Sequence, residues 1–447
     1  MLPLGIRIKR TAFFTLTAAI LSRYGAFGAA APNHVAKRDT SLAYVFTIAQ
    51  QYEAKAWLEG RDRFPAGARL VAIEGGMLRL LAPGFYASAD AEVSYDATRV
   101  LFAGKRAAAD HWQIWEVEIH GGAPGQLTHC ESDCVRPLYL PDGKSGSSGF
   151  VFSRGDGLEI MDAAGKTARI TFAPGRYLTD DVLRDGRILF EILRGQRSRE
   201  LFTVYPDGTG VESLRCDHGP DRGDARQISS GDYIFVAGNR LARITSALAH
   251  QVDVAQPDRE PAGPVAEISP GVLLVSLRRN GHFGLFRWDA TAMQTIPLET
   301  PTDASALQPV MIRPRTPPKQ FPSALVPTRT AGNLLCLNAR AFRSPLNGES
   351  VHSVKLYSQS GLLGQAEVER DGSFYVQVPP DRPIRMELVD AAGQVVQAEH
   401  NWFWMRPAEQ RICVGCHLGP ERAPENKVPE ILLKTIVPVK MLEVQGP

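Results

Sequence analysis

The chain has 447 residues, enough for two or three domains with packed cores. Apolar residues make up 44% of the sequence and charged residues 22%, a balance that excludes an intrinsically disordered protein. The net charge is +2, and −2 without four basic residues near the N-terminus, so bulk charge gives no basis for nucleic-acid binding. The 40 glycines and 32 prolines predict many turns and therefore many strands.

Residues 1–30 have the layout of a secretory signal peptide. A basic start with Arg7, Lys9 and Arg10 precedes the apolar run 11–22 and a stretch of small residues. A helix over that apolar run would span about 18 Å, too short for the roughly 30 Å core of a bilayer. We therefore predict a cleaved leader and an exported, periplasmic protein with no membrane span after cleavage. An uncleaved membrane anchor is the alternative.

Residues 42–320 contain a weak repeat of apolar strand cores. The cores are spaced 38 to 50 residues apart, which brackets the roughly 40–45 residues of a four-stranded propeller blade. They are residues 100–102, 150–152, 188–190, 234–236 and 273–275, and a stretch around 70–72 would supply another blade. We predict a β-propeller of about six blades; a pair of β-sandwiches is the alternative.

Second strands and tight turns accompany most of these cores. Asp-Gly pairs tolerate positive φ and favour hairpins, and they occur in the turns predicted at 141–144, 184–187 and 205–208. This succession of a strand, a short loop, a second strand and a Gly-rich turn resembles the blades of TolB-type propellers. It is clearest over residues 91–106 and 119–128. That resemblance implies a TolB-like propeller fold.

A proline-dense stretch follows the propeller, and residues 321–332 are predicted to be a stiff connector. Residues 333–400 then predict a small β-sandwich-like module. Its strands are expected at 333–338, 354–358, 366–369, 374–378 and 384–389, the last with alternating apolar and charged residues. The expected fold class is therefore all-β: a propeller, a sandwich-like module and a final segment, 401–447.

The final segment carries a chemical motif, Cys413-Val-Gly-Cys416-His417. Two thiols separated by two residues and followed by histidine form the attachment pattern of c-type haem, in which each thiol adds to a vinyl group and histidine binds the iron. The composition gives roughly 0.002 such pentapeptides by chance. We predict one covalent haem c on Cys413 and Cys416, with His417 bound to the iron. A redox disulfide and half of a zinc site are the alternatives for the cysteine pair.

The residues around this motif resemble a known family. Residues 371–374, 402–407 and 411–417 are similar to the middle, haem-binding region of hydrazine synthase alpha subunits, in which a propeller also precedes the haem motif. The resemblance implies a propeller–haem protein, and not hydrazine synthesis. Family members with an oxygen ligand to iron carry an aromatic residue four positions after the histidine, where this chain has Glu421. His417 therefore stays the expected iron ligand.

The apolar faces of a haem need cover, and little chain follows His417. We predict that Trp402 and Trp404 cover the porphyrin at the junction of the module and the propeller rim, where cofactor pockets commonly form. The alternative is that these side chains fill the core. The candidates for a sixth iron ligand are Met405, His400, Met441 and His352.

Three further cysteines carry weaker signals. Cys130 and Cys134 lie on a predicted loop near one mouth of the propeller channel. A local disulfide is favoured there in an exported protein, with an additional metal site as the alternative. Cys336 lies in an apolar strand and is predicted to be a buried thiol.

The leading functional hypothesis is an exported mono-haem protein that transfers electrons to a redox partner protein or performs redox chemistry at its haem. The alternative is a non-catalytic propeller scaffold that binds a protein partner. In that case the cysteine pair of the motif would be structural or would bind zinc. No nucleic-acid partner is expected.

Overall fold

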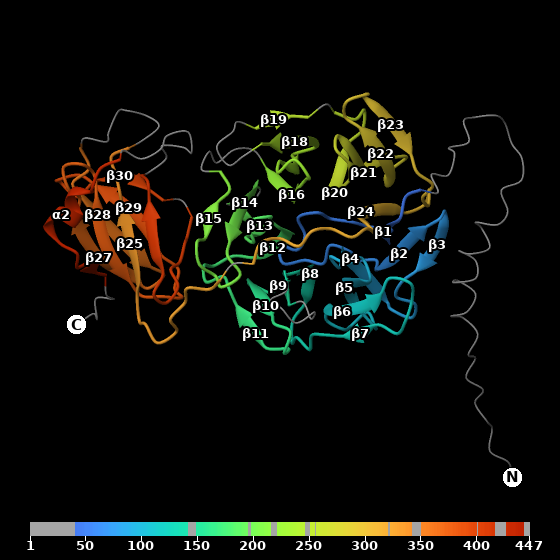
Figure 1. The fold of residues 1–447 in the computed structure, drawn as a ribbon, viewed down its shortest axis with the longest axis horizontal. Helices are drawn as coiled ribbons and strands as arrows, with labels where there is room; N and C mark the ends of the chain where they lie inside the picture. Colours follow the sequence, from blue (N-terminus) through green and yellow to red (C-terminus); the bar gives the residue numbers. More distant parts are fainter. Residues whose placement is uncertain are drawn as a thin grey trace, which may run out of the picture. The chain divides into compact units, whose positions relative to one another are not determined.

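The computed structural model describes residues 41–141, 149–194, 198–215, 221–245, 251–254, 256–320, 322–341, 350–399, 401–415 and 426–441. The predicted leader and most of the turn at 141–144 lie outside them. Strands dominate the described residues (Figure 1). The one described helix, α2 (Glu430–Lys434), has five residues, and no described helix is long and apolar enough to cross a membrane.

Six four-stranded antiparallel sheets of the described chain form a β-propeller, as the repeat predicted (Figure 1). We number the blades in chain order, and each sheet runs outward from the central channel. Blade II contains β4 (Ala87–Val93), β5 (Arg99–Lys105), β6 (Gln113–Glu118) and β7 (Gly125–Gln126). Blade III contains β8 (Cys134–Tyr139), β9 (Phe150–Arg154), β10 (Gly157–Met161) and β11 (Thr167–Arg169).

Blades IV to VI repeat the same order. Blade IV contains β12 (Tyr177–Val182), β13 (Ile188–Arg194), β14 (Ser198–Val204) and β15 (Glu212–Ser213). Blade V contains β16 (Arg222–Gln227), β17 (Tyr233–Ala237), β18 (Arg240–Ile244) and β19 (Val252–Asp253). Blade VI contains β20 (Pro261–Ser269), β21 (Val272–Arg279), β22 (His282–Asp289) and β23 (Gln294–Pro297).

Blade I joins the two ends of the propeller sequence. Its strands are, from the channel outward, β24 (Ser305–Met311), β1 (Tyr44–Ala49), β2 (Ala68–Glu74) and β3 (Met77–Leu80). Antiparallel pairing of β24 with β1 closes the ring. The stretch 70–72 does belong to a blade, as expected, but it forms the third strand from the channel, in β2.

The apolar strand cores fill the spaces between blades. The residues at the centres of the predicted cores are all at most 1% exposed: Phe102, Phe152, Phe190, Phe235 and Leu274. Burying an aromatic or leucine side chain contributes about 1.5–3 kcal/mol, so each of these positions stabilises the contact between neighbouring blades.

The innermost strands share a local irregularity. Each of β4, β8, β12, β16, β20 and β24 has a shift in its pairing register near its middle. At four of these shifts a polar residue adopts a positive φ of 52° to 60°: Asp90, Arg136, Asp224 and Gln308. Such bulges bend a strand and redirect a side chain. They therefore supply polar side chains to the propeller axis.

A β-sandwich follows the propeller. One sheet has the order β31 (Gln410–Cys413), β25 (Gly332–Cys336), β28 (Phe374–Val378) and β32 (Val439–Lys440). The other has the order β27 (Gly361–Glu367), β26 (Ser353–Ser358), β29 (Arg385–Val389) and β30 (Val395–Ala398). Residues of both sheets share one apolar core. Segment 401–447, which we expected after the module, supplies β31 and β32 to it, because each pairs in parallel with a central strand.

Residues 313–319, which lie between β24 and the predicted connector 321–332, are fastened at several blades. The backbone N–H groups of Arg315 and Lys319 donate to carbonyl groups of Tyr95 in blade II and Arg184 in blade IV. The guanidinium of Arg313 donates to the carbonyl groups of Glu267 and Ile268, in blade VI. These hydrogen bonds hold the stretch that leads into the connector against the propeller.

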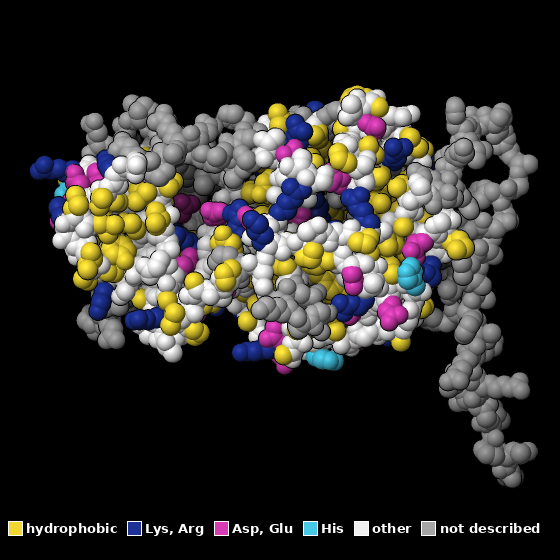
Figure 2. All heavy atoms as spheres, in the orientation of Figure 1, with side chains coloured by type: hydrophobic (Ala, Val, Ile, Leu, Met, Phe, Trp, Pro, Cys, Tyr) yellow, Lys and Arg dark blue, Asp and Glu magenta, His cyan; other side chains and the backbone are white. Residues whose placement is uncertain are grey.

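Exposed apolar side chains gather over the strands of the sandwich (Figure 2). The most exposed lie in and after α2: Leu433 at 72%, Ile436 at 83% and Val437 at 66%. This edge of the module, next to β32, is opposite the edge formed by β31.

Candidate functional site

Cys413 is the last residue of β31, the edge strand of the sandwich. β31 pairs in parallel with β25, so that Cys413 lies beside Cys336. The backbone N–H of Leu337 donates to the carbonyl of Cys413 at 2.8 Å and extends this ladder to the end of the strand. The first cysteine of the motif is therefore held at a defined sheet edge. Cys416 and His417 lie outside the described residues.

Gly415 continues the chain in a conformation that disfavours other residues. Its φ is +142°, and a Cβ atom built there would lie 2.6 Å from the carbonyl oxygen of Asn338. Side chains essentially never approach a backbone oxygen so closely. Glycine in the middle of the motif thus lets the backbone pass next to Asn338 as it leaves β31.

The two neighbours of Cys413 present apolar surface. Ile412 is 63% exposed and Val414 is 42% exposed, whereas Cys413 is half-buried. Side chains alternate along a strand, so Ile412 and Val414 share one face and Cys413 points to the other. The exposed apolar pair therefore lies on the face opposite the Cys413 thiol, which borders the sandwich core.

The Cys336 thiol touches the Cys413 thiol. Cys336 is fully buried in the sandwich core, as predicted. A hydrogen bond from Cys336 lowers the pKa of Cys413 to about 7, against the opposing effect of burial; the Gly415 backbone also contributes to the lowering. The sequence offered no sign of this neighbour, because parallel pairing joins positions that lie far apart in the chain.

Trp404 packs against the propeller rather than remaining available as cover. It is 1% exposed, and its indole N–H donates to the carbonyl of Gly208 at 2.8 Å. Its ring meets Phe172 edge-on at 6.1 Å. The Gly208 turn is one of those predicted from Asp-Gly pairs, and its positive φ of 83° matches that expectation. The alternative interpretation, core filling, therefore describes Trp404.

Trp402 is half-buried at the same boundary. It packs at the margin of the apolar cluster that contains Trp404 and residues of blades III and IV. The Arg385 guanidinium lies 5.7 Å from the centre of its ring. Trp402 is thus only partly covered by the protein, and it is the more accessible of the two predicted tryptophans.

Glu409 links the propeller to the start of β31. This 9% exposed carboxylate accepts hydrogen bonds from the Gly210 N–H at 3.0 Å and the Arg406 N–H at 2.7 Å. It also pairs with the Arg411 guanidinium at 2.7 Å. Because Arg411 lies on β31, this carboxylate fixes the strand that ends in Cys413 relative to blade IV.

Two of the expected sixth ligands belong to the sandwich core. Met405 is fully buried, and its side chain leaves no room for a Cβ at Gly332. Met441 is 1% exposed and packs in the same way against Gly364. His352 is exposed, and His400 lies outside the described residues. Neither methionine is placed as a free ligand.

Cys130 and Cys134 form a disulfide, with 6.6 Å between their Cα atoms. The alternative of an additional metal site on these two cysteines is therefore wrong, because neither sulfur remains as a thiolate ligand. Within the described ranges, no group of three or more His, Cys, Asp or Glu residues could hold a metal ion.

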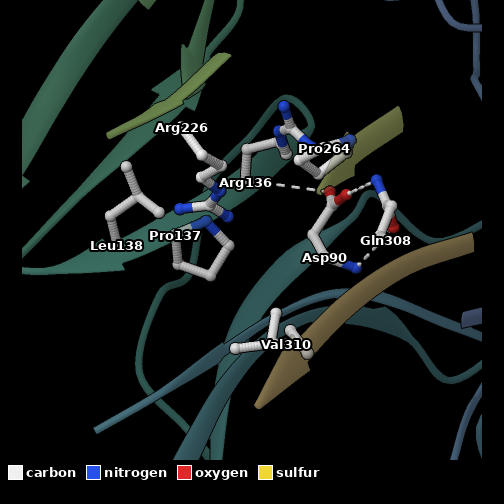
Figure 3. Close-up of a pocket in the computed structure, with 9 residues that line it drawn as sticks. Asp90, Arg136, Pro137, Leu138, Arg226, Pro264, Gln308 and Val310 are labelled. Atoms are coloured by element: carbon white, nitrogen blue, oxygen red, sulfur yellow. Dashed lines mark hydrogen bonds between the residues drawn. The ribbon is translucent and has the colours of Figure 1, made fainter. Parts of the chain in front are cut away.

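A buried charge network closes the propeller axis, and sequence patterns did not reveal it. Asp90 accepts hydrogen bonds from Gln308 at 2.8 Å and from the backbone of Arg136 at 3.1 Å (Figure 3). The Arg136 guanidinium pairs with Asp180 at 3.0 Å and with Asp224 at 3.5 Å. The cavity lined by Asp90, Arg136 and Gln308, among others, measures about 10 Å³, roughly the space of one water molecule. This part of the channel is therefore packed and is not an open path for a substrate.

Two carboxyl groups of this network are incompletely paired. One oxygen of Asp180 and one of Glu191 have no hydrogen-bond donor among the described residues. Burial raises the pKa of Asp180 to about 7, partly offset by Arg136. Burial and the nearby Asp180 charge raise the pKa of Glu191 well above its ordinary value. The folded propeller therefore retains protons that ordinary carboxyl groups lose in mild acid.

Comparison with known proteins bears on the segment that holds the motif. Residues 340–418 match the model of the hydrazine synthase alpha subunit middle domain. Over 79 residues the chain is 39% identical to hydrazine synthase subunit alpha of Kuenenia stuttgartiensis. The chain is similar to the hydrazine synthase alpha subunit. That alignment spans 17% of this chain and 10% of the relative.

The alpha-like fold extends well beyond the matched segment. The solved hydrazine synthase of Kuenenia stuttgartiensis superposes with a TM-score of 0.76 over 88% of this chain and 71% of its own, at 16% identity. A TolB from Acinetobacter baumannii aligns over 61% of this chain and 67% of its own, with a TM-score of 0.46 and 13% identity. The chain therefore combines its six-bladed propeller with a segment that is similar to the middle domain of the hydrazine synthase alpha subunit.

Proposed function

We propose that this chain is an exported mono-haem c-type protein that carries electrons for a redox complex. The observation that carries the proposal is the motif 413–417, which follows a fixed edge strand inside the segment that matches the alpha middle domain. A bound haem supplies one-electron redox chemistry.

Each residue of the motif has a role in this proposal. Cys413 and Cys416 bond covalently to the haem, and His417 binds the iron. Gly415 permits the close backbone passage beside Asn338. Ile412 and Val414 present exposed apolar side chains on the face of the chain opposite the Cys413 thiol.

A redox partner protein is a further part of the proposal. The relatives named above are a subunit of hydrazine synthase and its solved structure, so we infer that this chain also works within an assembly of several proteins. The exposed apolar side chains around α2 support this inference, because clustered apolar surface is typical of protein interfaces.

The test is a visible spectrum of the protein produced together with haem-ligation machinery. Thioether-bound haem predicts a Soret band that survives acid–acetone extraction. The double variant Cys413→Ser/Cys416→Ser should lose this band, because no sulfur remains for attachment. The double variant Cys130→Ser/Cys134→Ser removes two cysteines elsewhere and should keep it. A colourless wild-type chain, or a resistant band in the first variant, would refute the proposal.

A further inference from the structure

Cys336 is a third sulfur at the attachment site, and nothing in the haem motif accounts for it. We propose that Cys336 and Cys413 form a reversible disulfide in the chain before haem is attached, which withholds Cys413 from the porphyrin. The disulfide follows from the strand geometry alone, whereas its effect on haem attachment rests on the proposed function.

The geometry of the sheet brings the two sulfurs together. Cys336 and Cys413 are direct partners in the parallel ladder of β25 and β31. Neighbouring strands lie about 4.8 Å apart, and disulfides join Cα atoms separated by about 4.4–6.8 Å. Both side chains belong to or border the sandwich core, so they lie on the same face of the sheet. β31 is an edge strand, which leaves it free to adjust slightly on one side.

The two thiols have complementary properties for disulfide formation. Cys413 is half-buried and borders solvent, and the hydrogen bond from Cys336 lowers its pKa to about 7. A substantial fraction of Cys413 is therefore thiolate near neutral pH, the form that attacks disulfides. Cys336 is fully buried and is reachable only from its neighbour. Cys413 is thus suited to react first, and Cys336 second.

The proposed reaction uses a disulfide oxidant such as oxidised glutathione. The Cys413 thiolate attacks one sulfur of the oxidant, forms a mixed disulfide and releases one glutathione thiolate. Cys336 then loses its proton and attacks the Cys413 sulfur, which forms the Cys336–Cys413 bond and releases the second glutathione. Overall two protein thiols lose two electrons and two protons, and the oxidant gains them as two thiols. A dithiol reductant reverses both steps and frees Cys413.

The sequence alone would pair Cys413 with Cys416 instead. These cysteines are separated by two residues and form a common redox arrangement. The competition between Cys336 and Cys416 for Cys413 therefore gives the proposal a clear alternative.

The experiment maps disulfides in the full chain made without haem-ligation machinery. The protein is equilibrated with oxidised glutathione, alkylated, and digested with trypsin without reduction. We expect residues 330–340, which contain Cys336, to be linked to residues 412–422, which contain Cys413 and Cys416. The Cys416→Ser variant should retain this link and the Cys413→Ser variant should lose it. The Cys130–Cys134 disulfide serves as an internal control for oxidation.

Two results would overturn the proposal. One is an alkylated Cys336 together with a disulfide inside the peptide 412–422. The other is a link that survives in Cys413→Ser, because it would join Cys336 to Cys416. The effect on haem is read separately: Cys336→Ala should take up haem with less added reductant than wild type. If the peptides are linked but the protein takes up no haem, the proposed function is refuted and the proposed disulfide still stands.

Discussion

At the scale of single residues, the position of the haem motif depends on how the chain leaves β31. Cys413 is held by the sheet, and Gly415 passes within van der Waals reach of the Asn338 backbone. The first residue of the motif 413–417 therefore has a fixed position. Gly415 is required both by its positive φ and by the lack of room for a Cβ atom beside Asn338.

The variant Gly415→Ala tests this constraint. A Cβ atom at φ +142° and 2.6 Å from the Asn338 oxygen forces the backbone to move, which should cost about 1–3 kcal/mol in the free energy of unfolding. It should also lower the fraction of chains that carry haem. Denaturant unfolding and the ratio of haem to protein measure the two effects.

Gly393→Ala is the matched control in the same module. Gly393 also has a positive φ, +80°, but its Cβ would meet nothing within 4 Å. Backbone strain alone should cost about 1 kcal/mol there, with no loss of haem. Equal effects of the two variants would contradict the claim that contact with Asn338 matters.

At the scale of elements, residues 401–409 dock the sandwich onto blade IV. Trp404 buries its ring beside Phe172, Arg406 donates to the Asp207 carbonyl at 2.9 Å, and Glu409 accepts from Gly210. This segment thus joins the Asp-Gly turn between β14 and β15 to the strand that ends in Cys413. The position of the motif depends on this docking.

We expect Trp404→Ala to uncouple the sandwich from the propeller. Removal of a buried tryptophan side chain costs about 3–5 kcal/mol, and the Gly208 carbonyl loses its donor. Trypsin should then cleave at Arg329 in the connector or at Lys319 just before it, and unfolding should split into two transitions. Limited proteolysis and denaturant unfolding measure these changes.

Trp404→Phe separates the two contributions. It keeps a smaller aromatic ring and removes the indole N–H with part of the ring system, so a smaller cost of about 1–3 kcal/mol and a single transition are expected. Wild-type resistance of the connector in Trp404→Ala would show that this contact does not hold the two parts together.

The sequence predicted the positions of the strands better than it predicted which strands lie next to each other. Apolar runs such as 150–152 and 273–275 identified the blade strands, because a buried strand must be apolar along its length. Pairing across long stretches of chain left no local pattern. The closure of blade I by β24, the position of Cys336 beside Cys413, and the use of Trp404 at the propeller boundary therefore emerged only in the structure.

At the scale of the whole molecule, the propeller axis is closed by charges that compensate one another. Asp90, Arg136, Asp180 and Asp224 come from four different blades, so their contacts tie the ring together. The bulges that place these four side chains leave no recognisable pattern in the sequence. Composition and periodicity therefore did not indicate the charge network. Near Asp180 and Glu191, however, the described residues supply too few hydrogen-bond donors, and one oxygen of each carboxyl group has no partner among them.

This arrangement predicts a pH dependence of stability. Burial raises the pKa of Asp180 from its ordinary 3.8 to about 7, so the folded chain keeps a proton that the unfolded chain releases. The free energy of unfolding should therefore fall as the pH rises from about 4 to about 7. Asp180→Asn, which is neutral throughout, should flatten this slope and be more stable than wild type at pH 8 by at least about 1 kcal/mol.

Denaturant unfolding between pH 4 and pH 8 measures this dependence. Asp156→Asn, at a side chain 72% exposed, is the control and should follow the wild-type curve. A wild-type chain that gains stability over this range, or an Asp180→Asn variant that loses it at pH 8, would contradict the assignment of a buried proton.

The central claim, covalent haem on the motif, is tested most directly by mass spectrometry of one peptide. The holoprotein is digested with trypsin, and the fragment 412–422 is weighed under conditions that break noncovalent contacts. We expect this fragment to carry one haem, bonded through the sulfurs of Cys413 and Cys416. Recovery of the fragment with both sulfurs unmodified, from protein made with active haem-ligation machinery, would contradict it.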